Sequence, residues 1–186
     1  RFAGHGGGLA WDRGARSWRA LAVAVAVRPR EQRRWDDRGD RRLAQAIEAA
    51  LPMLHWVTYT AYPRAEVGAA FADGHTFASL IGEGAFHHAD DFDLGLFLIA
   101  PNVLYPDHQH AAPELYAPLT GPHAWRFLPD EQWKSIDADV PVWNEPWAPH
   151  ATHTGDTPFL CIFCWTRDVH LPAKIIAGRG ANVGEA

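Results

Sequence analysis

The sequence predicts a mainly β domain, either a barrel or a double-sheet jelly roll, with helices of its N-terminal part packed outside the sheets. Three observations predict this fold class. From about residue 75 the hydrophobic pattern changes to a period of two, glycines and prolines divide the chain into short segments, and clear helical spacing occurs only before that point. We expect an N-terminal helical extension of the same domain over 1–74, a β-barrel over 75–177 and a C-terminal tail over 178–186.

The N-terminal part is expected to hold the helices. The run LAVAVAV at 21–27 fits a short strand or a helix of small residues. Residues 41–54 are the clearest helix, with Asp40 as its N-cap and Pro52 near its end as a kink or stop. The apolar residues at helical spacing there are Leu43, Ile47, Leu51 and Leu54. We expect residues 61–72 to form a second, weaker helical or irregular piece.

The strands follow in order. Apolar residues alternate over 92–99, which predicts a strand buried on at least one face. The runs HAWRF at 123–127 and FLCIFCW at 159–165 are the next candidates. Cys161 and Cys164 lie three residues apart, so a strand would point their thiols to opposite faces. We interpret both cysteines as buried apolar residues.

Composition excludes several classes of function. The chain has 186 residues, of which 47% are hydrophobic and 21% charged, and a net charge of -5, so no basic surface for a nucleic acid is expected. No stretch approaches the roughly 20 apolar residues of a membrane span. The sequence starts at Arg1 rather than Met, which leaves open whether a leader was removed. We expect a cytoplasmic protein that acts on a small molecule, with a homodimer as an open alternative.

The segment YPDHQHAAPELYAPLTG, at 105–121, concentrates the polar chemistry of the chain. Its His108, His110, Glu114 and Tyr116 all have even numbers. On one extended segment, or on two strands joined by a register-keeping turn, these side chains face the same way. His and Glu are the usual nitrogen and oxygen ligands of a borderline transition metal. We therefore predict a metal site; the alternative is a polar surface hairpin whose histidines are solvated.

The spacing His-x-His-x3-Glu-x6-Gly resembles the first metal motif of the cupin superfamily, with Gly121 as its glycine. Asn102 stands where that motif has an earlier glycine, and Asn is the next-best residue for a positive φ. The resemblance implies a further histidine from a second motif, which lacks its usual glycines here. His150 and His153 are the candidates, and only one of them can face the site from a strand. Pro149 and the turn-rich TGDTP favour His150, with His153 as a neighbour at the mouth.

Two further stretches extend the resemblance. Residues 75–166 resemble the cupin-type dimethylsulfoniopropionate (DMSP) lyases. Besides the segment at 105–121, the resemblance includes the strand ending GLFLIAPN and the later run PHATHTGDTPFLCIFCW. The YPDHxH opening and a tyrosine two residues after the glutamate are the most specific marks. Pro113 before Glu114 is a difference from the family. The metal ligands that the resemblance implies are His108, His110, Glu114 and His150. It also implies a catalytic base at Tyr116 and pocket aromatics at Tyr105 and Trp165.

The implied activity is a carbon–sulfur lyase that cleaves DMSP, a sulfonium carboxylate, to acrylate and dimethyl sulfide. The proton beside the carboxylate is weakly acidic, so a Lewis-acidic divalent ion on that carboxylate and an anionic base are both needed. A nearby cation favours a phenolate, which makes Tyr116 a sensible base, and aromatic faces attract a sulfonium. Zinc, iron, manganese, nickel and cobalt all suit the ligands.

Other interpretations stay open at this point. The same fold hosts dioxygenases, isomerases and non-enzymatic binding proteins. Tyr116 could be a core tyrosine that only donates a hydrogen bond to a ligand. His87 and His88 lie in the polar run FHHADDFD and are interpreted as parts of a solvated turn. The isolated histidines, to which we assign no function, are His55, His75, His123 and His170.

Overall fold

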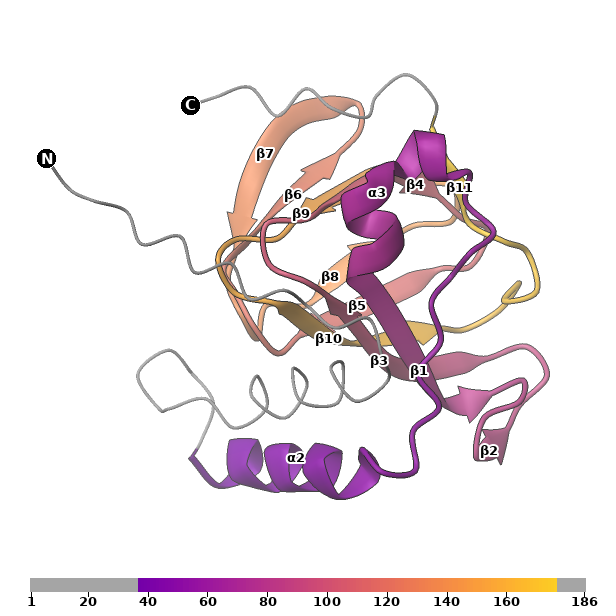
Figure 1. The fold of residues 1–186 in the computed structure, drawn as a ribbon, viewed down its shortest axis with the longest axis vertical. Helices are drawn as coiled ribbons and strands as arrows, with labels where there is room; N and C mark the ends of the chain where they lie inside the picture. Colours follow the sequence, from indigo (N-terminus) through magenta and orange to yellow (C-terminus); the bar gives the residue numbers. More distant parts are fainter. Residues whose placement is uncertain (1–36, 177–186) are drawn as a thin grey trace, which may run out of the picture.

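The computed structural model describes residues 37–176, and two β-sheets face each other in it (Figure 1). The predictions for 21–27 and for the tail at 178–186 fall outside the described residues. The six-stranded sheet has the order β2-β1-β3-β10-β5-β8 and the five-stranded sheet β11-β4-β9-β6-β7. The strands of the first sheet are β1 (His75–Gly82), β2 (His87–His88), β3 (Asp93–Ile99), β5 (Glu114–Pro118), β8 (Val142–Asn144) and β10 (Phe159–Trp165). Those of the second are β4 (Leu104–Gln109), β6 (His123–Phe127), β7 (Asp130–Ile136), β9 (His150–His153) and β11 (Lys174–Ile175).

Helix α2 (Asp37–Ala50) packs outside the six-stranded sheet, as predicted. Ile47 and Leu51 share a buried cluster with Leu96 and Leu98 of β3. The opposite face of β3 lies against the interior between the sheets, where Phe97 and Ile99 are buried. Strand β3 is therefore covered on both faces, which explains why its sequence is apolar at nearly every position.

The bounds of α2 differ from the predicted ones. The helix begins at Asp37, so the prediction of Asp40 as its N-cap is wrong. Acidic residues are stabilised in the first turn by the helix dipole, so such a residue marks a helix start only to within one turn. The helix ends at Ala50, two residues before Pro52, because the residue preceding a proline disfavours the helical region.

The second helix, α3 (Arg64–Gly74), lies against the interior cluster with Val67 and Phe71. His75 fixes the preceding segment: its Nδ1 donates to the Phe71 carbonyl at 2.6 Å, and the Tyr59 backbone N–H donates to its Nε2 at 3.2 Å.

In the described part of the chain, no helix is both long and apolar enough to cross a membrane. The proposed boundaries at 74 and 177 stay predictions.

Two backbone features of the predicted motif have a direct structural reason. Asn102 has φ 57°, as expected from its position in place of glycine. At Gly121 an added Cβ would lie 2.6 Å from the backbone nitrogen of Ala138, so only glycine allows this close approach of two chain segments. Both cysteines are free thiols; Cys161 is buried, as interpreted, whereas Cys164 is only half-buried.

Candidate metal centre and cavity

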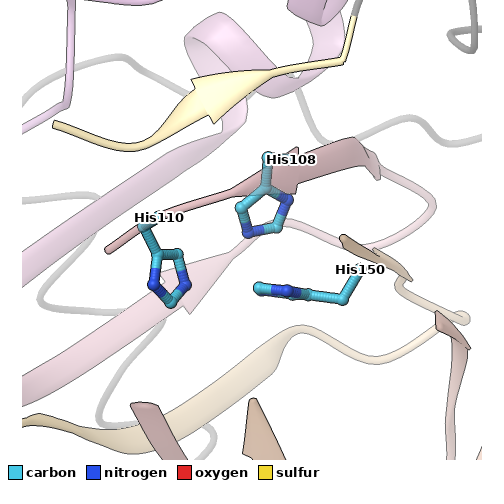
Figure 2. Close-up of side chains that lie close together, drawn as sticks. All are labelled: His108, His110 and His150. Atoms are coloured by element: carbon cyan, nitrogen blue, oxygen red, sulfur yellow. The ribbon is translucent and has the colours of Figure 1, made fainter. Parts of the chain in front are cut away.

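Three histidines converge in the interior between the sheets (Figure 2). His108 comes from β4, His110 follows that strand directly, and His150 opens β9, which pairs with β4 so that His108 and His150 are partners across the ladder. All three are buried, and one ligand atom from each lies within 4.8 Å of the others. Among the described residues this is the group that could hold a metal ion.

The protonation of the three rings is set by backbone carbonyls. Each Nδ1 lies 2.8–2.9 Å from a carbonyl oxygen two residues away: Pro106 for His108, Ala112 for His110 and Ala148 for His150. A carbonyl only accepts, so each Nδ1 carries the hydrogen and a neutral ring presents its Nε2 lone pair. This is the arrangement that orients histidine for a metal.

The free lone pairs supply the test of whether an ion fits. The Nε2 atoms of His108 and His150 are buried and have no hydrogen-bond partner. Burial lowers the pKa of His150 to about 4, and burial with the neighbouring histidines holds the pKa of His108 well below its usual value. Both rings are thus neutral near pH 7 and their unpaired nitrogens are competent ligands, so these residues fit a divalent ion.

Glu114 adds an oxygen to the group. Its Oε2 lies 3.1 Å from Nε2 of His110 and 3.7 Å from Nε2 of His150. Although burial opposes ionisation, the hydrogen bond and charge of His110 lower the pKa of Glu114, and the carboxylate raises the pKa of His110 in return. Three imidazole nitrogens and one carboxylate oxygen suit a transition metal and leave its identity open.

The four even-numbered residues come together, but not as one extended segment. Strand β4, before His110, belongs to the five-stranded sheet, whereas β5, which carries Glu114 and Tyr116, belongs to the six-stranded sheet. The expectation of one extended segment is therefore wrong, and the two strands that carry these residues are not paired with each other. The side chains converge because each strand points its inward face into the space between the two sheets.

A cavity of about 200 Å³ adjoins the histidine group. This volume is below the roughly 300–1,000 Å³ of sites for drug-sized ligands, so the cavity suits a small molecule. Glu114, Tyr116, Tyr105 and Trp165 all line it, whereas the three histidines do not. The other aromatic residues of its wall are Tyr59, Tyr62, Phe71, Phe77, Phe97 and Phe163.

Two aromatic residues connect the cavity wall to the histidines. Tyr105 stacks on His108 with ring centroids 3.6 Å apart, and its hydroxyl hydrogen-bonds that of Tyr62 at 2.6 Å. Trp165 stacks on His110 at 4.6 Å and donates from Nε1 to Oε1 of Glu114 at 2.6 Å. Both side chains therefore lie between the candidate ligands and the cavity, where a substrate would meet them.

Tyr116 lies two residues after Glu114 and is buried against Phe97 and Trp125. Burial, followed by the negative charge of Glu114, raises the pKa of Tyr116 well above its usual value. Its phenol stays protonated unless positive charge is brought beside it.

His153 lies elsewhere. It is not among the residues that line the cavity, and its ring is near Trp133, with centroids 6.4 Å apart. His150 and His153 end β9 on opposite faces, since three residues separate them. This placement gives no support to a substrate contact for His153.

Three residues that the sequence reasoning missed belong to this region. Asn144 donates from Nδ2 to Oε2 of Glu114 at 3.0 Å, while Tyr62 and Asp93 line the cavity. Their positions depend on strand pairing and on the segment before α3, for which no local pattern exists in the sequence. His87 and His88 are exposed, as expected, but they form the short strand β2 beside β1 rather than a turn.

A family model described as dimethylsulfoniopropionate lyase matches residues 21–161. The chain belongs to the DMSP lyase family. The match includes all four candidate ligands, Tyr105 and Tyr116, and ends before Trp165.

Individual DMSP lyases are similar to part of the chain. The chain is 31% identical over 108 residues to the dimethylsulfoniopropionate lyase DddQ of Ruegeria pomeroyi, an alignment that covers 58% of this chain and 53% of that protein. It spans about half the length of the curated relatives it matches. The crystal structure of DddQ from Ruegeria pomeroyi DSS-3 superposes with a TM-score of 0.65 at 24% identity, covering 83% of this chain and 76% of that one.

A more distant structure, a cupin-2 domain protein of Rhodospirillum rubrum, has a TM-score of 0.52 at 14% identity and covers 81% of this chain and 84% of that one. At these identities the superpositions establish the fold alone. The predicted cupin jelly roll is confirmed.

Proposed function

We propose that this chain is a metal-dependent carbon–sulfur lyase that cleaves DMSP to acrylate and dimethyl sulfide by β-elimination. The observation that carries the proposal is a cavity that is lined by Glu114 and Tyr116 and adjoins three buried histidines, of which His108 and His150 have unpaired Nε2 atoms. Membership of the DMSP lyase family supports the choice of substrate.

The ligands would be His108, His110, Glu114 and His150. Bound there, a divalent ion would act as a Lewis acid on the substrate carboxylate and make the neighbouring C–H bond more acidic. Zinc, iron, manganese, nickel and cobalt remain candidates. Asn144 and Trp165 hold both oxygens of Glu114 by hydrogen bonds, which keeps the carboxylate oriented within the group.

In this mechanism Tyr116 is the base. It takes the proton from the carbon next to the substrate carboxylate, the electron pair of that C–H bond forms the C=C bond of acrylate, and the C–S bond breaks. The sulfur keeps the bonding electrons and leaves as neutral dimethyl sulfide. The raised pKa of Tyr116 makes its phenolate a strong base, and the positive charges of the bound ion and the sulfonium favour its formation.

The aromatic wall suits the other end of the substrate. Trp165 and several phenylalanines line the cavity, and the faces of aromatic rings attract a cation by their quadrupole. Tyr105 lines it too, but His108 and Phe71 stack on both faces of its ring, so its edge and hydroxyl are what remain for a ligand. Closely packed side chains also exclude water, which strengthens each electrostatic interaction inside.

The test is product analysis with purified, metal-loaded protein. We expect dimethyl sulfide and acrylate in equal amounts, formed at the same rate with and without oxygen. Turnover of another small carboxylate that requires oxygen, with no dimethyl sulfide from DMSP, would instead indicate a cupin dioxygenase.

A further inference from the structure

The ionisable groups of the cavity wall favour a cation. Asp93 and Glu114 both line the cavity, whereas no Lys or Arg does among the described residues. The remaining basic group is His75, and burial lowers its pKa, so it adds no positive charge near pH 7. A substrate carboxylate thus has a binding group only at the histidine end, and a positive group is attracted to the rest of the cavity.

Trp165 lies between Asp93 and Glu114 in the six-stranded sheet. In the six-stranded sheet Asp93 pairs with Trp165, and Trp165 pairs with Glu114, so the three residues form one row across β3, β10 and β5. Two strand spacings separate the carboxylate-bearing residues, which places their Cα atoms about 10 Å apart. The Trp165 indole leans toward Glu114, to which it donates its N–H.

The Asp93 carboxylate is incompletely satisfied. Its Oδ1 is buried, and no described residue donates a hydrogen bond to it. Burial raises the pKa of Asp93, and a hydrogen bond from Ser79 only partly offsets this effect. A structural carboxylate would normally have donors for both oxygens, because an unpaired buried oxygen is costly. Oδ1 lies next to Gly82, while the residue as a whole lines the cavity, so a cationic ligand there would offset the charge of the carboxylate.

We propose that Asp93 binds the cationic end of the substrate and makes the site selective for carboxylates that carry a sulfonium or ammonium group. The inference rests on the proposed function, because it takes the substrate carboxylate to lie beside Glu114 and the histidines. In DMSP two methylene carbons separate the carboxylate from sulfur. A substrate bound in this way extends along the face of Trp165 toward Asp93.

The experiment compares two ligands of the same shape. In 3-(trimethylammonio)propionate a quaternary nitrogen takes the place of the central carbon of the tert-butyl group in 4,4-dimethylpentanoate, so the two differ only in charge. Their Kd values for metal-loaded protein are measured by titration calorimetry. We expect the wild-type protein to bind the cationic ligand about tenfold more tightly, the effect of one charge pair in a partly solvated site. Equal affinities in the wild-type protein would overturn the inference without any variant.

Two variants then assign the preference to one residue. Asp93→Asn is expected to lower the ratio of the two Kd values severalfold, to what the aromatic wall alone supplies, while leaving the Kd of 4,4-dimethylpentanoate unchanged, which also shows that the cavity is intact. Asp156→Asn, which changes an exposed carboxylate that does not line the cavity, should keep the wild-type ratio. A wild-type ratio in Asp93→Asn would refute the role of this residue. Failure of the proposed lyase activity is distinguishable, since it would appear as absent dimethyl sulfide with the charge preference still present.

Discussion

One hydrogen bond to each histidine determines which ring nitrogen is available to bind a metal. A backbone carbonyl holds the proton of each ring on Nδ1. The Nε2 atoms of His108 and His150 are left unpaired, and Nε2 of His110 lies against Glu114. The sequence pointed to His108 and His110 by their spacing, and the resemblance to the second cupin motif implied His150. It could not predict the tautomers, because the carbonyls of Pro106, Ala112 and Ala148 acquire their directions only from the folded backbone.

Tyr116 gives the sharpest prediction for a single side chain. The change Tyr116→Phe removes one oxygen and leaves the ring that packs against Phe97. We expect dimethyl sulfide release to fall by at least about 100-fold, the usual contribution of a general base. Metal content, measured by plasma mass spectrometry, should stay at the wild-type level. Substantial turnover by this variant would show that another group takes the proton.

Strands rather than residues determine how Glu114 is held. Strand β5 lies between β8 and β10, and each neighbour supplies one donor to the carboxylate, from Asn144 and Trp165. The sequence identified the β10 run with its correct bounds because FLCIFCW is apolar and flanked by turn residues. Strand β8 has three residues and no periodic pattern, so neither it nor the part played by Asn144 was predictable.

The pairing of β8 with β5 leads to a prediction about metal affinity. Asn144→Ala removes the donor to Oε2 of Glu114, and we expect metal binding to weaken about 10- to 100-fold, as is typical when a residue that orients a ligand is lost. The matched control is Trp143→Ala on the exposed face of the same strand. The metal affinity of both variants is measured by competition with a fluorescent chelator. Equal affinities in the two variants would contradict the prediction.

The two sheets are also joined away from the metal site. His123 of β6 lies 3.2 Å from the Thr120 hydroxyl, which donates to the Pro158 carbonyl and accepts from the Leu160 N–H of β10. The Gly155 N–H donates to Nδ1 of His123, so the neutral ring carries its hydrogen on Nε2. Burial lowers the pKa of His123 to about 4.

This pKa predicts how stability depends on pH. His123 takes up a proton at about pH 6.5 in the unfolded chain but only at about pH 4 in the folded chain. The contribution of the neutral ring to the free energy of unfolding is therefore complete above pH 6.5 and is lost as the pH falls from 6.5 to 4. At about 1.4 kcal/mol per pKa unit the loss amounts to about 3 kcal/mol. Urea unfolding of the wild-type protein and of His123→Gln at pH 7 and pH 4.5 measures it. The variant should lose less stability, and parallel losses would exclude His123 as the cause.

For the whole molecule, the fold class followed from the sequence and the assembly of the site only in part. Alternation in β3 and the glycine and proline spacing were sufficient to predict short strands in a barrel or a double-sheet jelly roll. The partners of each strand were not predictable, since β3 pairs with β10 some sixty residues away through contacts that only the fold creates. The segment before α3 that brings Tyr59 and Tyr62 to the cavity also escaped prediction for this reason.

The dependence of dimethyl sulfide release on a metal tests the central claim most directly. Purified protein is given DMSP, and headspace gas chromatography follows dimethyl sulfide before chelation, after removal of metal by a chelator, and after a divalent ion is added back. We predict that release stops on chelation and returns with the ion, because the base alone cannot remove so weakly acidic a proton. Undiminished release by metal-free protein would contradict the mechanism.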